Sequence, residues 1–551
     1  MTNVAEPVLS IRNLTIDLPR GGDRPHAVSN LSLEIREKEI LCIVGESGSG
    51  KSITSFAAMG LLPKVLKPSA GEILFEGRDV LKLSEAEHSG LRGNHMGMIF
   101  QEPMSALNPC YTVGDQIEEV FKAHTTLSKT ERRERTMALL KEVRLPEPER
   151  LYHAYPHQLS GGQRQRIVIA IALAMEPRLL IADEPTTALD VTTQAQILDM
   201  FKALKESRKA GILFVTHDFD VVAEIADRVV VMQKGVVVEQ GSVEQVLNNP
   251  RHPYTRMLID AVPKRHGGKG DPKMSAPIAL RVAGIEKTFS TARTFFKPAR
   301  KVQAVKPTDF TVLEGQTLGI VGESGSGKTT LVRCLMGLVE PDEGSIWIGN
   351  DRLDTRTVAG RRNFRKHIQI VFQDPYGSLN PRRTIGDLLV EGPVNFGVPR
   401  KQAIEKAREL MRIVRLEEDA LDRYPVQFSG GQRQRISIAR ALMVEPKILI
   451  ADEAVSALDV SVQKDVLKLL DDIRKSVSLT VIFITHDLRV AAEISDHILV
   501  MSKGEVVEYG AVDDIFGNPQ HSYTRQLLAA MPGRGWEAPN MAALSAADAT
   551  R

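Results

Sequence analysis

The sequence predicts an α/β protein built from two tandem copies of one domain. Its clearest feature is the octet Gly45–Ser52, which fits the pattern G-x-x-x-x-G-K-[ST]. The apolar run 40–44 before it is typical of a buried parallel strand, and the stretch 53–61 after it is typical of a helix. The pattern returns at Gly322–Thr329, and an apolar run ending in two acidic residues also occurs twice. We therefore expect two phosphate-loop domains in one chain.

Composition limits the class of protein. Hydrophobic residues make up 42% of the 551 residues and charged residues 25%, which is ordinary for a globular protein, and the net charge of +2 gives no nucleic-acid signature. Cys42, Cys110 and Cys334 lie far apart, which favours neither disulfides nor a metal cluster and fits a reducing compartment. Residues 1–13 do not resemble a signal peptide, and the longest apolar run, 167–175, is too short to span a bilayer. We expect any contact with a membrane to come through partner chains.

The octet carries the chemistry of phosphate binding. Glycines let successive backbone N–H groups point at phosphate oxygens, and the following helix N-terminus favours negative charge. The lysine can reach the β- and γ-phosphates, and the hydroxyl that follows it can bind Mg²⁺. The alternative is a glycine-rich turn with a chance lysine. The residues expected to bind phosphate are Gly45, Ser47, Gly48, Gly50, Lys51 and Ser52 in the first copy, and Gly322, Ser324, Gly325, Gly327, Lys328 and Thr329 in the second.

Further repeated motifs set the domain boundaries. The tetrad 160–163 returns at 429–432, and Thr-His-Asp at 216–218 returns at 485–487. We expect a first domain over residues 8–262, a linker rich in Gly, Lys and Pro over 263–277, a second domain over 278–532 and a disordered tail over 533–551.

The first domain shows the patterns of both strands and helices. A charged helix is expected at 128–145, where Ser128 and Glu131 form a possible capping box, and its counterpart is expected at 400–416. We interpret the apolar stripes of these helices as core packing; they contain Thr136, Leu140 and Val143, and in the second copy Ile404, Ala407, Met411 and Val414. The other strands are expected at 8–18, 31–35, 71–75, 96–100 and 212–215.

Polar groups follow the ends of the predicted strands. Asp183 can hold Mg²⁺, and Glu184 can accept a proton from an attacking water or orient it. Gln101 can carry an amide oxygen to Mg²⁺ or orient a water, and His217 can contact a γ-phosphate. Taken singly, each has a plain alternative: solvated acids at a strand edge, a solvated loop glutamine or a structural histidine.

Ser160-Gly161-Gly162-Gln163 stands before a long apolar run. This places small residues at a helix N-terminus, where backbone N–H groups and the Ser160 hydroxyl can bind an anion. Ser-Gly-Gly is also a common N-cap, and only its position between the phosphate loop and the acidic strand makes it specific.

This order of motifs resembles the ATP-binding subunits of ABC transporters. The residues that carry the resemblance are GESGSGKS, Gln101, LSGGQ, LLIADE, ALD and His217, and the resemblance covers nearly the whole chain twice. It implies that each half has an ATP-binding α/β core, a small antiparallel β part and a helical subdomain. It also implies ATP and Mg²⁺ as cofactors.

The resemblance further implies head-to-tail docking of the two halves. ATP would lie between the phosphate loop of one half and the SGGQ segment of the other, with Asp190 and Asp459 between the sites. Site one would use Lys51, Ser52, Gln101, Asp183, Glu184 and His217, closed by Ser429, Gly431 and Gln432. Site two would use Lys328, Thr329, Gln373, Asp452, Glu453 and His486, closed by Ser160, Gly162 and Gln163. Because both sets keep the lysine, the carboxylates and the histidine, we expect two hydrolytic sites.

The chain departs from the family pattern at a few positions. Phe428 replaces the leucine of the signature, and Ala454-Val455 stands where the first half has Pro185-Thr186. Ile171 stands where the second half has Arg440, so a polar contact is lost there.

The expected adenine contacts also differ between the halves. Phe289 is the candidate for stacking on adenine in the second half, whereas the first half offers Leu18 at the matching place. Adenine stacking in the first site therefore has no aromatic candidate.

Each half ends in N-P-x-H-x-Y-T-R, at 249–256 and 518–525. This ending resembles the oligopeptide, dipeptide and nickel importer branch, and the fusion of two halves resembles the Yej-type peptide importers that take up microcin C. Many members of the branch continue into a cysteine cluster for an iron–sulfur centre, which we do not expect here because no cysteine follows Cys334. The resemblance implies a peripheral subunit on the cytoplasmic face of the plasma membrane, working with two permease chains and a substrate-binding protein.

Three alternatives remain open at this stage. One is a twin-cassette factor acting on the ribosome, which would carry a long charged linker helix. Another is a DNA-repair or chromosome ATPase, which would need large insertions or coiled coils. The third is an importer of nickel or glutathione rather than of peptides.

Overall fold

The computed structural model describes residues 6–21, 23–187, 189–263, 276–290, 301–354, 357–456 and 458–539. The chain divides into two compact units. The first comprises Met1–Leu189, Thr193–Val262 and Pro532–Arg551, and the second comprises Asp190–Thr192 and Pro263–Met531. Most of the expected linker (264–275) and the end of the expected tail (540–551) lie outside the described residues.

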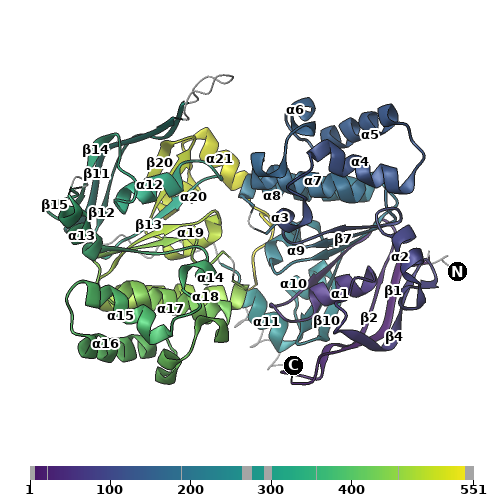
Figure 1. Cartoon of the computed structure of the whole chain (residues 1–551), viewed down its shortest axis with the longest axis horizontal. Helices are drawn as coiled ribbons and strands as arrows, with labels where there is room; N and C mark the ends of the chain where they lie inside the picture. Colours follow the sequence, from purple (N-terminus) through teal and green to yellow (C-terminus); the bar gives the residue numbers. More distant parts are fainter. Residues whose placement is uncertain are drawn as a thin grey trace. The chain divides into compact units, whose positions relative to one another are not determined.

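The larger sheet of the first unit has six strands in the order β10-β9-β3-β8-β7-β6. Figure 1 labels two of them, β7 and β10. All neighbours run parallel except the antiparallel pair β9 and β10. Every residue of β3, β7 and β8 is buried, and a strand buried on both faces has a continuous apolar sequence. The strands are β3 (Ile40–Val44), β6 (Met96–Ile99), β7 (Leu179–Asp183), β8 (Gly211–Val215), β9 (Arg228–Gln233) and β10 (Val236–Ser242).

The smaller sheet of the first unit is antiparallel, in the order β2-β1-β4-β5. It contains β1 (Leu9–Asp17), β2 (His26–Ile35), β4 (Lys67–Phe75) and β5 (Arg78–Asp79). Strands β2 and β4 begin earlier than their apolar patterns predict, because their first residues, His26 and Lys67, still pair with Asp17 of β1. Backbone pairing continues there past several register shifts, which interrupt the alternation of side chains.

The second unit repeats both sheets. Its larger sheet has the order β16-β17-β18-β13-β19-β20, and its smaller sheet has the order β12-β11-β14-β15. The strands are β11 (Ile278–Ser290), β12 (Lys301–Leu313), β13 (Thr317–Val321), β14 (Glu343–Ile348), β15 (Asp351–Arg352), β16 (Ile368–Val371), β17 (Ile448–Asp452), β18 (Thr480–Ile484), β19 (His497–Ser502) and β20 (Glu505–Ala511). The expectation of two α/β domains of one fold is confirmed.

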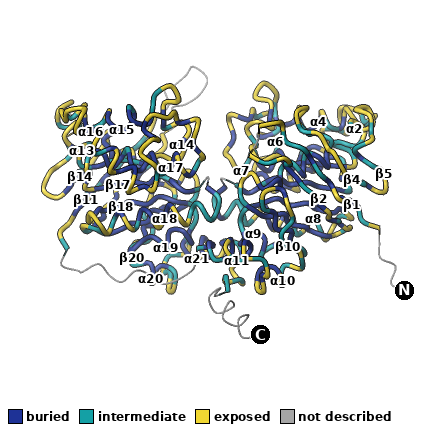
Figure 2. Tube along the Cα trace, turned by 90° about the horizontal axis from the view of Figure 1, so that it is seen from below, coloured by how far each residue is buried: buried dark blue, intermediate teal, exposed yellow. Residues whose placement is uncertain are grey.

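Helices complete each unit, and buried residues line the interior while exposed ones gather in outer loops and turns (Figure 2). In the first unit they are α1 (Lys51–Ala58), α2 (Glu85–Leu91), α3 (Pro103–Ala106), α4 (Val113–His124), α5 (Lys129–Glu142), α6 (Pro148–Tyr152), α7 (Gly161–Leu173), α8 (Val191–Ser207), α9 (Phe219–Ile225), α10 (Val243–Asn248) and α11 (Pro253–Asp260). In the second they are α12 (Lys328–Leu335), α13 (Val358–His367), α14 (Pro375–Ser378), α15 (Ile385–Asn395), α16 (Arg400–Ile413), α17 (Gly430–Leu442), α18 (Val460–Val477), α19 (Leu488–Ile494), α20 (Val512–Gly517) and α21 (Ser522–Ala529). In the part of the chain that the structure describes, none of them combines the length and apolar character needed to cross a bilayer.

The charged helices form where the sequence predicts them. Ser128 caps α5 with a capping box to Glu131, and Thr136, Leu140 and Val143 are fully buried. In the second unit Ala407, Met411 and Val414 are buried too, and Ile404 packs against the same core. The interpretation of both stripes as core packing is confirmed.

The buried stripe of α5 gives a stability prediction. Leu140→Ala should lower the local free energy of unfolding by about 2–5 kcal/mol, because it removes buried methyl groups and leaves a cavity. Hydrogen-exchange protection of the amides of α4 and α5 measures this loss. The exposed Glu134→Ala on the same helix is the control and should change it by less than about 0.5 kcal/mol. Equal protection in the two variants would contradict the packing account.

Candidate functional site

Three neighbouring parallel strands bring the motifs of the first unit to one edge of the sheet. In the order β3-β8-β7, the phosphate loop follows β3, His217 comes shortly after β8, and Asp183 ends β7. The carboxyl ends of parallel strands are where open α/β sheets bind ligands. The second unit has the same order, β13-β18-β17, and therefore the same edge.

The phosphate loop of the first unit curls around its own lysine. The Lys51 Nζ donates to the carbonyl oxygens of Gly45 at 2.7 Å and Glu46 at 3.0 Å, and the side chain is buried. Gly45 has φ +152°, and a Cβ there would lie 2.2 Å from the carbonyl oxygen of Met232, so only glycine fits. Helix α1 begins at Lys51, which places the N–H groups of its first turn beside the loop.

The second phosphate loop has the same geometry. The Lys328 Nζ donates to the carbonyl oxygens of Gly322 at 2.6 Å and Glu323 at 2.9 Å. A Cβ at Gly322 would lie 2.3 Å from the carbonyl oxygen of Met501. Both loops can therefore present a lysine and a helix N-terminus to phosphate oxygens.

Ser52 and Asp183 meet although 131 residues separate them. The Ser52 hydroxyl donates to the Asp183 Oδ1 at 3.1 Å, which places two hard oxygen ligands side by side. Burial raises the pKa of Asp183 to about 6, and the nearby Glu184 charge adds to that rise. In the second unit burial likewise raises the pKa of Asp452, but among the described residues Thr329 makes no hydrogen bond to it.

Glu184 is the centre of a polar cluster. Its Oε2 accepts from the Gln101 amide at 3.0 Å and the Thr187 hydroxyl at 3.1 Å, and lies 3.2 Å from the His217 Nδ1. Burial is the largest influence and raises the pKa of Glu184, but the hydrogen bond and charge of His217, with Lys51, outweigh it and lower that pKa to about 2.

Glu453 repeats this cluster. The Gln373 amide donates to its Oε2 at 2.7 Å, and the His486 Nδ1 lies 3.5 Å from the same atom. His486 outweighs the effect of burial and lowers the pKa of Glu453, and the Glu453 contact in turn raises the pKa of His486 against the effect of its own burial.

Both glutamates have an unusual backbone. Glu184 has φ +47° and Glu453 has φ +48°, in the left-handed region that costs a residue with a Cβ about 1 kcal/mol or more. Each is held there by its backbone N–H, which donates at 2.9 Å to a carbonyl of the neighbouring strand, Val215 or Ile484. Other matched pairs, such as Glu176 and Glu445, share this backbone conformation, so it reflects the common fold of the two units.

The Ser-Gly-Gly-Gln segments cap helices, as their patterns predict. Ser160 is the N-cap of α7 in a capping box with Gln163, and Ser429 is the N-cap of α17 in a capping box with Gln432. Gly162 and Gly431 lie close to the start of the next long helix. A Cβ there would lie 2.6 Å from Thr193 and 2.3 Å from Val462, respectively.

The remaining predicted residues make other contacts, and Asp190 lies close enough to the second phosphate loop for its charge to act on Lys328. Asp190 accepts a hydrogen bond from the Thr192 hydroxyl at 2.8 Å, and Asp459 is the N-cap of α18. Phe289 is 45% exposed near the end of β11, with the Lys287 ammonium 5.7 Å from its ring centre.

No aromatic residue takes the place of Phe289 at the matching position of the first unit. Leu18 packs against the core of that unit. Nearby, the Arg24 guanidinium donates to the Gly48 carbonyl, so a cation lies against the phosphate loop. The structure does not describe residue 22 or residues 291–300.

The departures from the family pattern have local explanations. Phe428 is buried, with the Arg423 guanidinium 4.6 Å from its ring centre. Arg440 donates to the Ser378 carbonyl at 2.5 Å, a contact that Ile171 cannot make in the first unit. Ala454 and Val455 are both buried.

A tyrosine in each domain ending holds the phosphate loop, which the sequence did not reveal. The Tyr254 hydroxyl accepts from the Glu46 N–H at 3.2 Å and donates to the Glu46 Oε2 at 3.1 Å. The Tyr523 hydroxyl accepts from the Glu323 N–H at 3.2 Å. The repeated N-P-x-H-x-Y-T-R ending was the only signal in the sequence, and it did not predict this contact.

The capping turn of each ending is anchored to the large sheet. Glu239 of β10 accepts from the N–H groups of Arg251 at 2.7 Å and His252 at 3.1 Å. His252 caps α11 through its Nδ1, and Glu508, Gln520 and His521 repeat the arrangement in the second unit. The endings therefore connect the outer strand of the sheet to the phosphate loop.

Two family models match the chain. The model described as "ABC transporter" matches residues 28–187 and 305–456. The model described as "Oligopeptide/dipeptide transporter, C-terminal region" matches residues 238–295 and 507–545, which include both N-P-x-H-x-Y-T-R endings.

Two curated relatives match along almost the whole chain. A glutathione import ATP-binding protein of Escherichia coli O157:H7 is 45% identical, covering 95% of this chain and 89% of the relative. A peptidoglycan transport ATP-binding protein of Agrobacterium fabrum is also 45% identical, covering 95% of this chain and 96% of the relative.

The tyrosine contact predicts an effect on nucleotide binding. Tyr254→Phe removes the hydroxyl group that binds Glu46. The loss of one hydrogen bond costs about 0.5–1.5 kcal/mol, so nucleotide affinity at the first site should fall about 2–10-fold. Equilibrium titration in a Lys328→Ala background isolates that site. Tyr111→Phe, at an exposed tyrosine, is the matched control. Unchanged affinity after Tyr254→Phe would show that the contact does not position the loop.

The raised pKa of Asp183 predicts a pH-dependent stability. A buried acid whose pKa rises from 3.8 to about 6 destabilises the folded state increasingly as pH rises through that window. Asp183→Asn removes this titration, so the free energy of unfolding of the variant relative to wild type should grow by about 1.4 kcal/mol between pH 5 and pH 8. Denaturant unfolding of the nucleotide-free chain measures it. A constant difference over that range would refute the assigned pKa.

Proposed function

The chain belongs to the ABC transporter family, and on that premise we propose that it is the ATP-hydrolysing subunit of an importer for small peptides. The observation that carries the proposal is the double occurrence of a full set of phosphate-binding and acidic groups, each linked to a domain ending of the oligopeptide and dipeptide transporter type. Both relatives named above are ATP-binding proteins of import or transport systems, which supports the same activity. Glutathione, itself a tripeptide, is a second candidate cargo because of the glutathione import relative.

In this proposal each phosphate loop binds the phosphates of one ATP. Lys51 and Lys328 neutralise the β- and γ-phosphates from inside their loops. Ser52, Asp183 and Gln101 supply oxygen ligands for Mg²⁺ in the first site, as do Thr329, Asp452 and Gln373 in the second. The oxygen atoms of Ser52 and Asp183 suit a hard cation. Among the described residues, no group of three His, Cys, Asp or Glu side chains could hold a metal ion alone. Phosphate oxygens and water would therefore complete the coordination shell.

Glu184 and Glu453 are proposed to accept the proton of the attacking water. While His217 contacts Glu184, the carboxylate has a pKa near 2 and is a weak base. We expect His217 to turn to the γ-phosphate when ATP binds, which removes its hydrogen bond and raises the basicity of Glu184. His486 would act on Glu453 in the same way. In each site the histidine would link nucleotide binding to activation of the base.

Closure of the two units is proposed to complete both sites. Ser429, Gly431 and Gln432 would meet the phosphates bound by the first unit, and Ser160, Gly162 and Gln163 would meet those bound by the second. The support is that each segment opens a helix, whose N-terminus favours an anion. ATP can drive closure only because it binds the closed state more tightly than the open state.

Transport then requires partner chains. We propose two membrane permease subunits and a substrate-binding protein, with this chain on the cytoplasmic face of the membrane. Co-purification from detergent extracts tests the partner: permease chains are expected, and ribosomes would support the rival translation factor. Uptake assays in cells lacking the chain should show a loss of small-peptide or glutathione import. A selective loss of nickel import would contradict the proposed cargo class.

The assignment of the bases is tested by Glu184→Gln combined with Glu453→Gln. This double variant should bind ATP with near wild-type affinity but lose ATP hydrolysis by at least about 100-fold, because the water loses its proton acceptor. Steady-state phosphate release measures the loss. The matched exposed pair Glu149→Gln and Glu405→Gln should hydrolyse ATP normally. Normal turnover in the double variant would exclude these glutamates as bases.

A further inference from the structure

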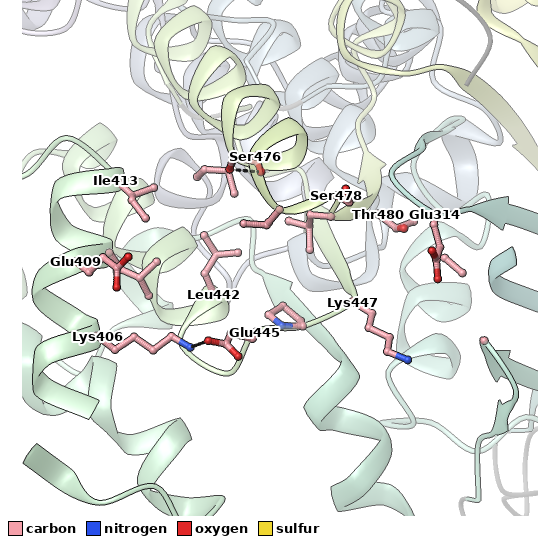
Figure 3. A pocket seen from close by; sticks show the side chains of 17 residues that line it. Glu314, Lys406, Glu409, Ile413, Leu442, Glu445, Lys447, Ser476, Ser478 and Thr480 are labelled. Carbon is pink, nitrogen blue, oxygen red and sulfur yellow. Dashed lines mark hydrogen bonds and ion pairs between the residues drawn. The ribbon is translucent and has the colours of Figure 1, made fainter. Parts of the chain in front are cut away.

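The second unit contains a cavity of about 480 Å³ that the proposed ATPase cycle does not use (Figure 3). It lies where α16 passes the end of α18 and the starts of β17 and β18. Apolar side chains form much of its wall: Leu410, Ile413, Leu442, Ile473, Val477 and Leu479. Because the nucleotide site lies at the opposite, carboxyl ends of these strands, the two sites are separate.

The apolar wall has a charged rim. Lys406 forms an ion pair with Glu445, as the close-up shows. The cavity is also lined by Glu314, Glu409 and Lys447. Within the part of the chain that the structure describes, none of these three side chains forms an ion pair. Three carboxylates therefore face two ammonium groups, which leaves the rim with a net negative charge.

In the first unit, an arginine side chain occupies the position that corresponds to this cavity. Leu179 of β7 pairs with Gly211, and Ile448 of β17 pairs with Thr480, so the two units align residue by residue. In that alignment Arg208, three residues before Gly211, corresponds to Val477.

Arg208 fills its site in the first unit. Its guanidinium donates to Glu142 at 2.8 and 3.1 Å and to the Leu173 carbonyl at 3.4 Å, and lies 4.0 Å from Glu176. Its side chain is only 18% exposed. Leu173 and Glu176 correspond to Leu442 and Glu445, which line the cavity of the second unit.

The second unit has therefore lost this arginine and also its main carboxylate partner, because Ile413 ends α16 where Glu142 ends α5. It keeps the leucine carbonyl and the second glutamate. Val477 is too short to reach Glu445, and its side chain and that of Ile413 are left 64% and 43% exposed. A glutamate, Glu409, stands near the vacated space from α16. The space is within the usual size of a small-molecule site, and its wall matches an alkyl chain while its rim matches a cation.

We propose that this cavity binds an alkylguanidinium group, supplied by a free small molecule or by an arginine of a peptide. The alkyl chain lies along Leu410, Leu442 and Ile473. The guanidinium reaches the Leu442 carbonyl and Glu445, the counterparts of two contacts of Arg208. Glu409, one turn before Ile413 on α16, supplies the carboxylate that Glu142 supplies in the first unit.

Calorimetric titration of the full chain with n-butylguanidinium tests the proposal. Wild type should bind this probe at least tenfold more tightly than n-butylurea, a neutral analogue of the same shape. Val477→Arg fills the cavity with the side chain of the first unit and should weaken probe binding at least tenfold. Val358→Arg, at a valine of α13 that is 74% exposed, is the matched control and should bind like wild type.

A second set of measurements keeps the test valid if Val477→Arg does not fold. Glu445→Gln combined with Glu409→Gln should also weaken binding of n-butylguanidinium, and leave n-butylurea unaffected. Binding of N-acetylarginine methylamide with equal or higher affinity would identify a peptide arginine as the ligand, and weaker binding would identify a free molecule. Equal binding of guanidinium and urea, or binding that survives Val477→Arg, would overturn the proposal.

Discussion

The order of three parallel strands is the constraint on which the rest of the structure depends. With β8 between β3 and β7, the ends of the two outer strands lie about 10 Å apart, since neighbouring strands are about 4.8 Å apart. That spacing lets Ser52, at the start of α1, reach Asp183 at the end of β7, and lets His217, after β8, reach Glu184. The second unit has the same order and the same histidine–glutamate contact. The site is thus a consequence of topology, and each strand needs only to be apolar enough to be buried.

The two units share this frame but differ around it. The first links its hydroxyl and aspartate directly and has an arginine against its phosphate loop, whereas the second presents an exposed phenylalanine near the end of β11. The cavity beside α18 is a third difference, because Val477 and Ile413 stand where the first unit has Arg208 and Glu142. The proposed catalytic glutamates and histidines lie in the shared frame, and all of these differences except the Ser52–Asp183 hydrogen bond lie outside it. The proposed catalytic groups are therefore alike in the two units, whereas the residues around them differ.

Much of this architecture could be predicted from the sequence because it depends on local patterns. The buried strands appear as apolar runs, the phosphate loops as glycine spacing, and Ser128 and Glu131 as a capping box. The contact between Tyr254 and Glu46 could not be predicted, because 208 residues separate the partners and no periodicity links them. The left-handed backbone at Glu184 and Glu453 was also hidden, since glutamate rarely adopts it. The cavity could not be predicted either, because it required knowing that Arg208, 66 residues away in the sequence, binds Glu142.

The central claim is that one chain contains two complete nucleotide sites. The most direct test counts bound molecules of a non-hydrolysable ATP analogue by equilibrium dialysis of the full chain. The account predicts two per chain for wild type and one per chain for Lys51→Ala and for Lys328→Ala. One molecule per wild-type chain, or two in either lysine variant, would contradict it.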